Sequence, residues 1–179
     1  MRDFSLNLPI NSVSFGQVSV ALLREFHARE LQPSIFPVGE AVDLSCQDTI
    51  SEDFQKWMQS CTAKRFEEHN RSNPVFKLWH LTGSLDSFSK DQILLTFYEL
   101  DSPTKTELNI AKNNTRLAFS SSSSKTLFED NGVENVKHIP LGFDKTNFKV
   151  KDQNYLKGKM VFNLTGKLEK RKNHKQIIQ

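Results

Sequence analysis

Residues 4–26 have the sequence FSLNLPINSVSFGQVSVALLREF, and this stretch decides the fold. Its first seven residues alternate between apolar and polar side chains, as a half-buried strand does. Apolar side chains then recur at helical spacing at Val18, Leu22 and Phe26. With a second short strand expected at 33–39, the chain opens as strand, loop, helix and strand. Such a unit predicts a parallel pair of strands joined by a right-handed crossover.

The same alternation of strands and helices continues along the chain. A capping-box spacing at Thr49 and Glu52 predicts a helix that runs to about His69. Five serines at 120–124 stand between a predicted strand and a helical pattern, so we expect them to cap a helix. Further strands are expected at 75–81, 92–100, 116–119 and 136–140. The pattern predicts an α/β protein with a Rossmann-like parallel sheet flanked by helices.

Composition and charge favour a globular protein that has no nucleic-acid partner. Hydrophobic residues make up 37% of the 179 residues and charged residues 25%, and the net charge is only +3. Cys46 and Cys61 lie outside any metal or disulfide spacing, so reduced thiols and no metal site are expected. A secretory signal pattern is lacking, and no apolar run approaches about 20 residues. These features predict a cytoplasmic protein.

A polar stretch at 141–157 predicts a domain boundary. We expect one domain over 1–144, a linker over 145–158 and the start of a second domain over 159–179. In this last part, an apolar strand at 160–164 precedes a basic loop and a helix from Asn173. A strand that lacks its own sheet is prone to pair elsewhere. We therefore expect 159–179 to be disordered, folded back, or engaged in self-association with a second copy.

Three segments bear a resemblance to a known family when taken together and in order. They are LPINSVSFG at 8–16, VKHIPLGFD at 136–144 and FNLTGKLEKRKNH at 162–174. They resemble, respectively, the glycine loop, the end of the N-terminal domain and the opening of the donor domain in retaining GT-B glycosyltransferases of the family 4 type. The resemblance implies the N-terminal half of a GT-B fold, followed by the first strand and helix start of the C-terminal domain.

The family resemblance implies an enzyme that moves a sugar from a nucleotide-sugar donor, UDP- or GDP-linked, to a glycan, lipid or other acceptor. It implies no metal or other cofactor, and a cytoplasmic parent enzyme that is peripheral at the membrane. Because we expect the donor domain to be incomplete here, we predict that this chain alone transfers no sugar.

The resemblance also assigns candidate donor-binding residues. Lys167 and Lys172 match the two cationic positions that hold the donor diphosphate, on which negative charge grows in the transition state. A cationic loop before a helix N-terminus suits that task. The alternative is a solvated basic loop. Gly16 matches the loop glycine that lets the backbone approach the sugar or phosphates, and the alternative is an ordinary turn glycine.

Acceptor-side candidates follow two predicted strands. His80 comes at the end of one strand, and Glu99 and Asp101 come at the end of the next. The carboxyl ends of parallel strands are where such sheets bind ligands. These side chains are therefore candidates for contacting acceptor hydroxyls or transferring protons. The alternatives are a packed or capping His80 and carboxylates that only cap the following helix.

A function of another class also fits the sequence. A small non-catalytic flavodoxin-like domain that binds a nucleotide or a protein partner would have a similar length, although it would not need the strand and helix start after 159. A dinucleotide-dependent oxidoreductase is not favoured, because no G-x-G-x-x-G occurs.

Overall fold

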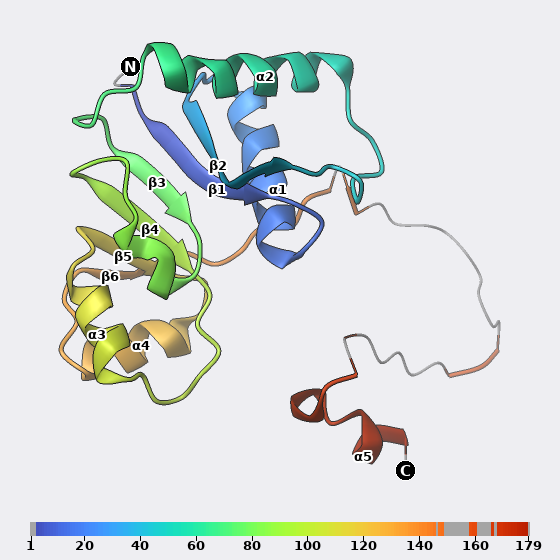
Figure 1. Ribbon diagram of the computed structural model, residues 1–179. Helices are drawn as coiled ribbons and strands as arrows, with labels where there is room; N and C mark the ends of the chain where they lie inside the picture. Colours follow the sequence, from blue (N-terminus) through green and yellow to red (C-terminus); the bar gives the residue numbers. More distant parts are fainter. Residues whose placement is uncertain (1–2, 146, 149–157, 161–165, 167, 179) are drawn as a thin grey trace. The chain divides into compact units, whose positions relative to one another are not determined.

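The computed structural model describes residues 3–145, 147–148, 158–160, 166 and 168–178 (Figure 1). The chain divides into two compact units, Met1–Phe148 and Lys149–Gln179. The first unit ends four residues beyond the predicted domain limit at 144. The predicted strand at 160–164 falls almost entirely outside the described residues.

A six-stranded parallel sheet forms the centre of the first unit. Its strands lie in the order β2-β1-β3-β4-β5-β6. Their bounds are β1 (Ser5–Ile10), β2 (Ser34–Val42), β3 (Val75–Leu78), β4 (Gln92–Thr96), β5 (Arg116–Phe119) and β6 (Val136–His138). The predicted α/β class and Rossmann-like parallel sheet are confirmed.

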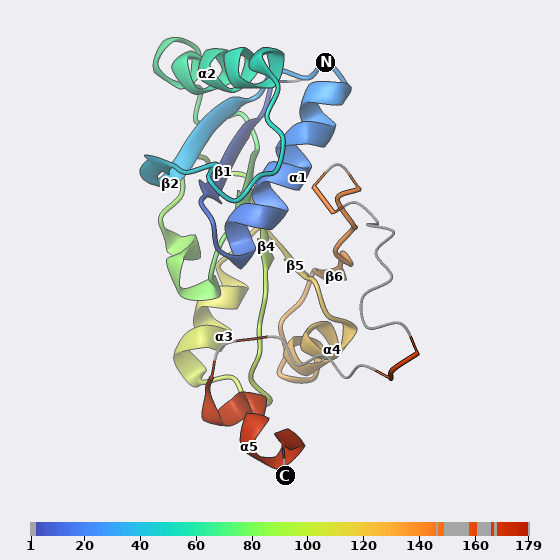
Figure 2. The ribbon, with the colours of Figure 1, turned by 90° about the vertical axis from the view of Figure 1, so that its right-hand side faces the viewer.

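Helices flank this sheet on both faces. The first unit contains α1 (Ser14–Ala28), α2 (Glu52–Glu67), the 3-10 turn η1 (Leu81–Leu85), α3 (Lys105–Lys112) and α4 (Ser122–Asp130). Viewed along the sheet, α1 lies on one side and η1 and α3 on the other, while α2 lies beyond the β2 edge (Figure 2). The second unit contains a 3-10 turn η2 (Lys170–Lys172) and a short helix α5 (His174–Ile178).

Two hydrophobic clusters hold the sheet from its opposite faces. One joins β1 and β2 to α1 and α2 and includes Leu95 of β4. The other includes the neighbouring Leu94 and packs β4, β5 and β6 against η1, α3 and α4. In it, the rings of Phe119 and Phe128 lie 4.6 Å apart. Burial of consecutive leucines on both faces is what a central strand of a parallel sheet requires.

The helix caps confirm one expectation and correct another. Ser121 accepts a hydrogen bond from the amide of Ser124 at 3.4 Å, so the serine run does cap α4. The capping box expected at Thr49 is wrong, because Ser51 caps α2 by accepting from the Phe54 amide at 3.2 Å. The carbonyl of Thr49 instead accepts from the Arg24 guanidinium at 2.9 Å.

Three strands, β3, β4 and β6, end earlier than the sequence predicts. β4 stops at Thr96, which pairs with Phe119, the last residue of β5, so no partner strand remains beyond it. β3 stops at Leu78, and η1 follows, a turn that the periodicity does not predict. A Cβ on Gly83 would lie 2.5 Å from the Trp79 ring, so glycine is what lets η1 fold against that indole.

Candidate functional site

The carboxyl ends of β1 and β3 form the centre of the candidate site. These strands are neighbours, but β1 leads into α1 on one face of the sheet and β3 leads into η1 on the other (Figure 2). The strand order reverses here, and sheets of this kind bind ligands outside the strand ends at such a point. We call the ends of β1 and β3 with their following loops the switch point.

Gly16 lies in the first turn of α1 and brings the helix directly against the end of β1. A Cβ at this position would lie 2.0 Å from the carbonyl oxygen of Asn11. Gly16 is therefore a close-packing glycine within a helix and not an ordinary turn glycine. The first amides of α1 have no intrahelical partner, and the Val13 side chain does not cap them.

His80 lies at the same switch point. It is exposed, and its ring packs edge-on against Phe15 with centroids 4.7 Å apart and against Trp79 at 5.0 Å. Phe15 is the neighbour of Gly16 in α1, so the structure brings two of the predicted site residues, Gly16 and His80, to one place. Because His80 is exposed, part of its side chain remains accessible to solvent beside these two rings.

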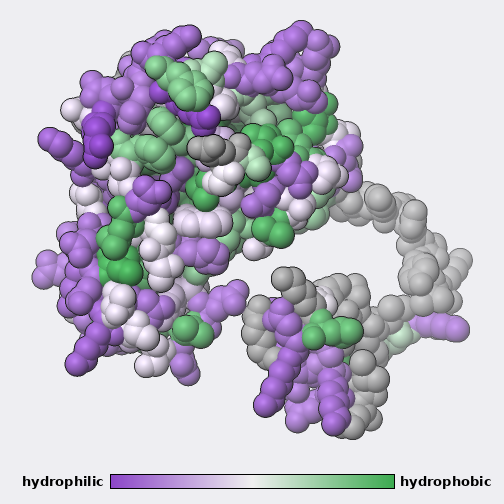
Figure 3. Space-filling model, viewed as in Figure 1, coloured by the Kyte–Doolittle hydropathy of each residue, from purple (hydrophilic) through white to green (hydrophobic). Residues whose placement is uncertain are grey.

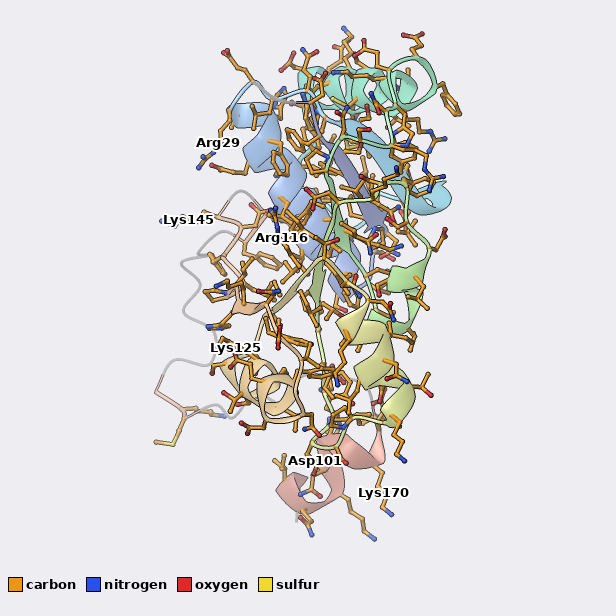
Figure 4. The ribbon with its side chains drawn as sticks, turned by 90° about the vertical axis from the view of Figure 1, so that its left-hand side faces the viewer. Arg29, Asp101, Arg116, Lys125, Lys145 and Lys170 are labelled. Carbon is orange, nitrogen blue, oxygen red and sulfur yellow. The ribbon has the colours of Figure 1, made fainter. Side chains whose placement is uncertain are left out.

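Glu99 and Asp101 lie elsewhere, and their expected place at a strand end is wrong. Because β4 stops at Thr96, both residues lie in the loop before α3, and both are exposed. Asp101 lies at the end of the sheet opposite α2 (Figure 4). Thr104 and Glu107 form the capping box of α3, so these two residues, and not Glu99 or Asp101, cap this helix.

Glu107 also affects the pKa of Tyr98, its hydrogen-bonded neighbour across the loop. Tyr98 donates a hydrogen bond from its hydroxyl to the Glu107 carboxylate at 3.2 Å. Burial, followed by the Glu107 charge, raises the pKa of Tyr98 to about 12. The backbone amide of Thr104 holds the pKa of Glu107 below its usual value. The pair therefore keeps a neutral phenol beside a carboxylate at neutral pH, which suits a structural contact better than proton transfer.

The second unit contains the donor-side candidates. Lys172 is exposed in η2, and a Cβ at Gly166 would lie 3.9 Å from both Lys172 and His174. His174 is only 9% exposed, and its Nε2 has no hydrogen-bond partner within the described part of the chain. Lys167 lies outside the described residues. The structure thus gathers a glycine, a lysine and a histidine, the last of which the sequence did not single out.

A network of amide side chains fixes the chain where it leaves the first unit. The Asn147 side chain accepts from the Asp48 amide at 3.1 Å and donates to Gln17 at 3.4 Å. Gln47 also donates to Gln17, at 3.0 Å. The segment after β6 is therefore held against α1 and the loop that follows β2, close to the switch point at which α1 begins.

Sequence reasoning missed a pocket on the η1 side of the sheet. It is a cavity of about 500 Å³ whose lining includes Asn7, Phe36, Arg65, Lys77, Trp79 and Phe88. The available signal was Lys77 itself, a charged residue between Phe76 and Leu78 in a predicted strand. Its alternation places it on the sheet face with Asn7, its register partner on β1.

No protein-family model matches this chain, and neither does any curated protein or solved structure. Within the described residues, no group of three or more His, Cys, Asp or Glu side chains is arranged to hold a metal ion. Among these residues, no helix has the length and apolar character that crossing a membrane demands.

Proposed function

We propose that this chain belongs to a glycosyltransferase that moves a sugar from a nucleotide-sugar to a glycan, lipid or other acceptor, and that the first unit is its acceptor side. One observation supports this most. Gly16, chosen from the family resemblance, and His80, chosen from its place at a strand end, meet at the switch point of a parallel sheet. The three resembling segments also follow one another along the sequence in the order in which the family has them.

In this proposal the two units have different tasks. His80 and the first turn of α1 contact hydroxyl groups of the acceptor, because an imidazole and helix amides without intrahelical partners are hydrogen-bonding groups at the strand ends. Lys172, with Lys167, offsets the negative charge of the donor diphosphate. Glu99 and Asp101 remain candidates only for an extended acceptor, since their loop lies toward the α3 side of the sheet.

Binding tests this proposal better than turnover, because it tests each unit with its own ligand class. The ¹⁵N-labelled chain is titrated with methyl glycosides and, separately, with UDP-glucose and GDP-mannose. Glycosides should shift amide resonances of 11–16 and 79–81, and His80→Ala should weaken that binding at least about five-fold, equivalent to roughly 1 kcal/mol. Sugar nucleotides should shift residues around 166–175, and Lys172→Gln should weaken that effect.

Lys105→Gln, which changes an exposed lysine at the start of α3, is the matched control and should change neither titration. The proposal fails if neither ligand class shifts either region, or if His80→Ala and Lys172→Gln bind as the unchanged chain does.

The strand order supports a second candidate function. The order β2-β1-β3-β4-β5 is that of flavodoxin-like folds, which bind nucleotides at the same switch point. A non-catalytic nucleotide-binding module should bind UDP or GDP at 11–16 as tightly as the corresponding sugar nucleotide and should ignore glycosides. That result would favour the module over the glycosyltransferase.

A further inference from the structure

The pocket on the η1 side of the sheet contains a buried lysine with an incomplete set of partners. Lys77 is only 2% exposed. Among the described residues, its Nζ donates one hydrogen bond, to the backbone carbonyl of Asp86. An ammonium group has three donors, so two remain. No carboxylate oxygen of the described residues lies within 4.0 Å of this nitrogen, and burial lowers the pKa of Lys77.

A second cation reaches the same pocket from the end of α2. The Nε of Arg65 is buried and has no hydrogen-bond partner among the described residues. Its guanidinium carbon lies 4.5 Å from the centroid of the Phe66 ring. No ion pair involves Arg65 in the described part of the chain. Two cations therefore face one cavity. Asp86 also lines it, but its carboxylate is exposed and attracts Lys77 from a longer distance than an ion pair.

Four aromatic residues, Phe36, Phe66, Trp79 and Phe88, are among the remaining residues that line the pocket. Phe36 and Phe88 stack with centroids 4.4 Å apart and an interplanar angle of 21°. Phe66 is 78% exposed at the rim. Figure 3 looks onto the η1 side of the first unit, where hydrophobic and hydrophilic side chains of the described residues are intermixed. The cavity, of about 500 Å³, lies within the size range of small-molecule sites.

The backbone of β2 is irregular beside this cavity. The register of β1 on β2 shifts between Leu8 and Ile10, and Gly39, which lines the pocket, has a φ of +77°. Irregular strands of this kind are enriched next to functional sites, because they change the direction of side chains and locally interrupt the hydrogen bonds between strands. Gly39 has no atom within 4 Å of where its Cβ would be, which leaves the mouth open on that side.

A buried cation that lacks a counter-charge is costly, because it has lost its hydration without gaining an ion pair. An anionic ligand would supply the missing acceptors to Lys77 and Arg65 together, and the aromatic walls would cover an apolar portion of the same molecule. We propose that this pocket binds a small organic anion, a phosphate or carboxylate group joined to a planar or apolar ring. This site does not depend on the proposed glycosyltransferase function.

The alternative is that Lys77 serves only to anchor the segment after η1 through Asp86. Four probes separate the two roles in calorimetric and ¹⁵N NMR titrations: phenyl phosphate, benzoate, inorganic phosphate and benzyl alcohol. Phenyl phosphate or benzoate should bind saturably and shift resonances of β1, β2 and β3. Inorganic phosphate, which lacks the ring, should bind at least about five-fold more weakly, and benzyl alcohol, which lacks the charge, should not saturate the site.

Variants then test the two cations. Lys77→Met and Arg65→Met should each weaken binding of phenyl phosphate or benzoate at least about ten-fold, whereas Lys90→Met, which removes an exposed charge nearby, should leave it unchanged. Thermal unfolding shows whether each variant is folded, and Arg65→Met alone decides the matter if Lys77→Met is not.

The proposal is overturned if no anion binds saturably, if benzyl alcohol binds as tightly as phenyl phosphate, or if the folded Lys77→Met and Arg65→Met variants bind as Lys90→Met does. A comparison of the affinities for phenyl phosphate and benzoate distinguishes a phosphate ligand from a carboxylate ligand.

Discussion

The two faces of β1 are both buried, but they are built from different chemistry. Toward α1, the side chains of Leu6, Leu8 and Ile10 are at most 1% exposed. Toward η1, Ser5 and Asn7 are also at most 4% exposed, and Lys77 of β3 continues this polar face. Alternating apolar and polar residues usually mark one buried and one wet face. Here the polar face is enclosed as well, by Phe88 and the end of α2, and it lines a cavity.

The two faces of β1 therefore have different roles in the protein. Burial of apolar side chains stabilises the fold at roughly 25 cal/mol per Å², so the α1 face supplies stability. Buried polar groups cost free energy unless every one of them is hydrogen-bonded. Lys77 makes only part of the hydrogen bonds that its ammonium group can donate. Burying polar groups on the η1 face therefore costs folding free energy.

The largest expected effect comes from the α1 face. Leu8→Ala should lower the free energy of unfolding by about 2–5 kcal/mol, because it opens a cavity in a packed core. Asn7→Ala, one residue away on the polar face, should cost only about 1 kcal/mol, since it removes the hydrogen bond from its side chain to the Phe36 carbonyl. Urea unfolding measures both. Equal losses would show that the two faces do not differ as described.

The next effect concerns the contact between α1 and the end of β1. Gly16→Ala should destabilise the protein by about 1–3 kcal/mol, because the added methyl group meets the Asn11 backbone and the loop must shift. Gly142→Ala is the matched control, since no atom lies within 4 Å of its Cβ position. Thermal unfolding compares the two variants. If Gly16→Ala is as stable as Gly142→Ala, the close approach at the switch point is not required.

Much of this organisation follows from the sequence, and the parts that do not follow have physical reasons. Periodicity places the strands and helices because burial of side chains on known faces creates it. The same signal cannot show where β4 ends, since Phe97 and Tyr98 remain apolar and only the loss of its partner strand after Phe119 stops the ladder. Glu99 and Asp101 were misplaced for this reason.

The polar pocket shows a second limit of sequence patterns. Lys77 in a strand is ordinarily explained by a solvated face, and only the three-dimensional arrangement of the segment after η1 reveals that it is buried. Gly16 and His80 were predicted as site residues separately, and their proximity follows from the observed pairing of β1 with β3. Their ring contact through Phe15 could not be predicted, because it depends on side-chain packing.

A smaller effect is expected from the buried Lys77, whose contribution to stability should depend on pH. The pKa of Lys77 is lowered by burial, so near pH 9–10 the unfolded chain binds more protons at this site than the folded one does. The contribution of Lys77 to stability therefore rises as pH increases through its lowered pKa toward the ordinary value of 10.5. At pH 7, Lys77→Met should be within about 1 kcal/mol of the unchanged chain, or more stable than it.

The Lys77→Met variant should lose that relative advantage as the pH increases. Urea unfolding at several values between pH 7 and pH 10 measures the difference, with Lys90→Met as the control for general alkaline effects. A difference that stays constant, or that moves in favour of Lys77→Met, contradicts an enclosed charged lysine.

The smallest effect on stability is expected from replacing His80. Its size shows whether His80 at the switch point is part of the packing or is suited to contacting a ligand. His80 is exposed and contacts Phe15 and Trp79 only through its ring, so His80→Ala should change the free energy of unfolding by less than about 1 kcal/mol. Phe15→Ala, which removes a ring buried between Trp79 and Phe97, should cost about 3–5 kcal/mol. A residue that contributes little to folding, yet is held in one orientation by two rings at the strand ends, is suited to contacting a ligand. If His80→Ala costs as much as Phe15→Ala, His80 is part of the packing, and the switch point loses its main candidate for acceptor binding.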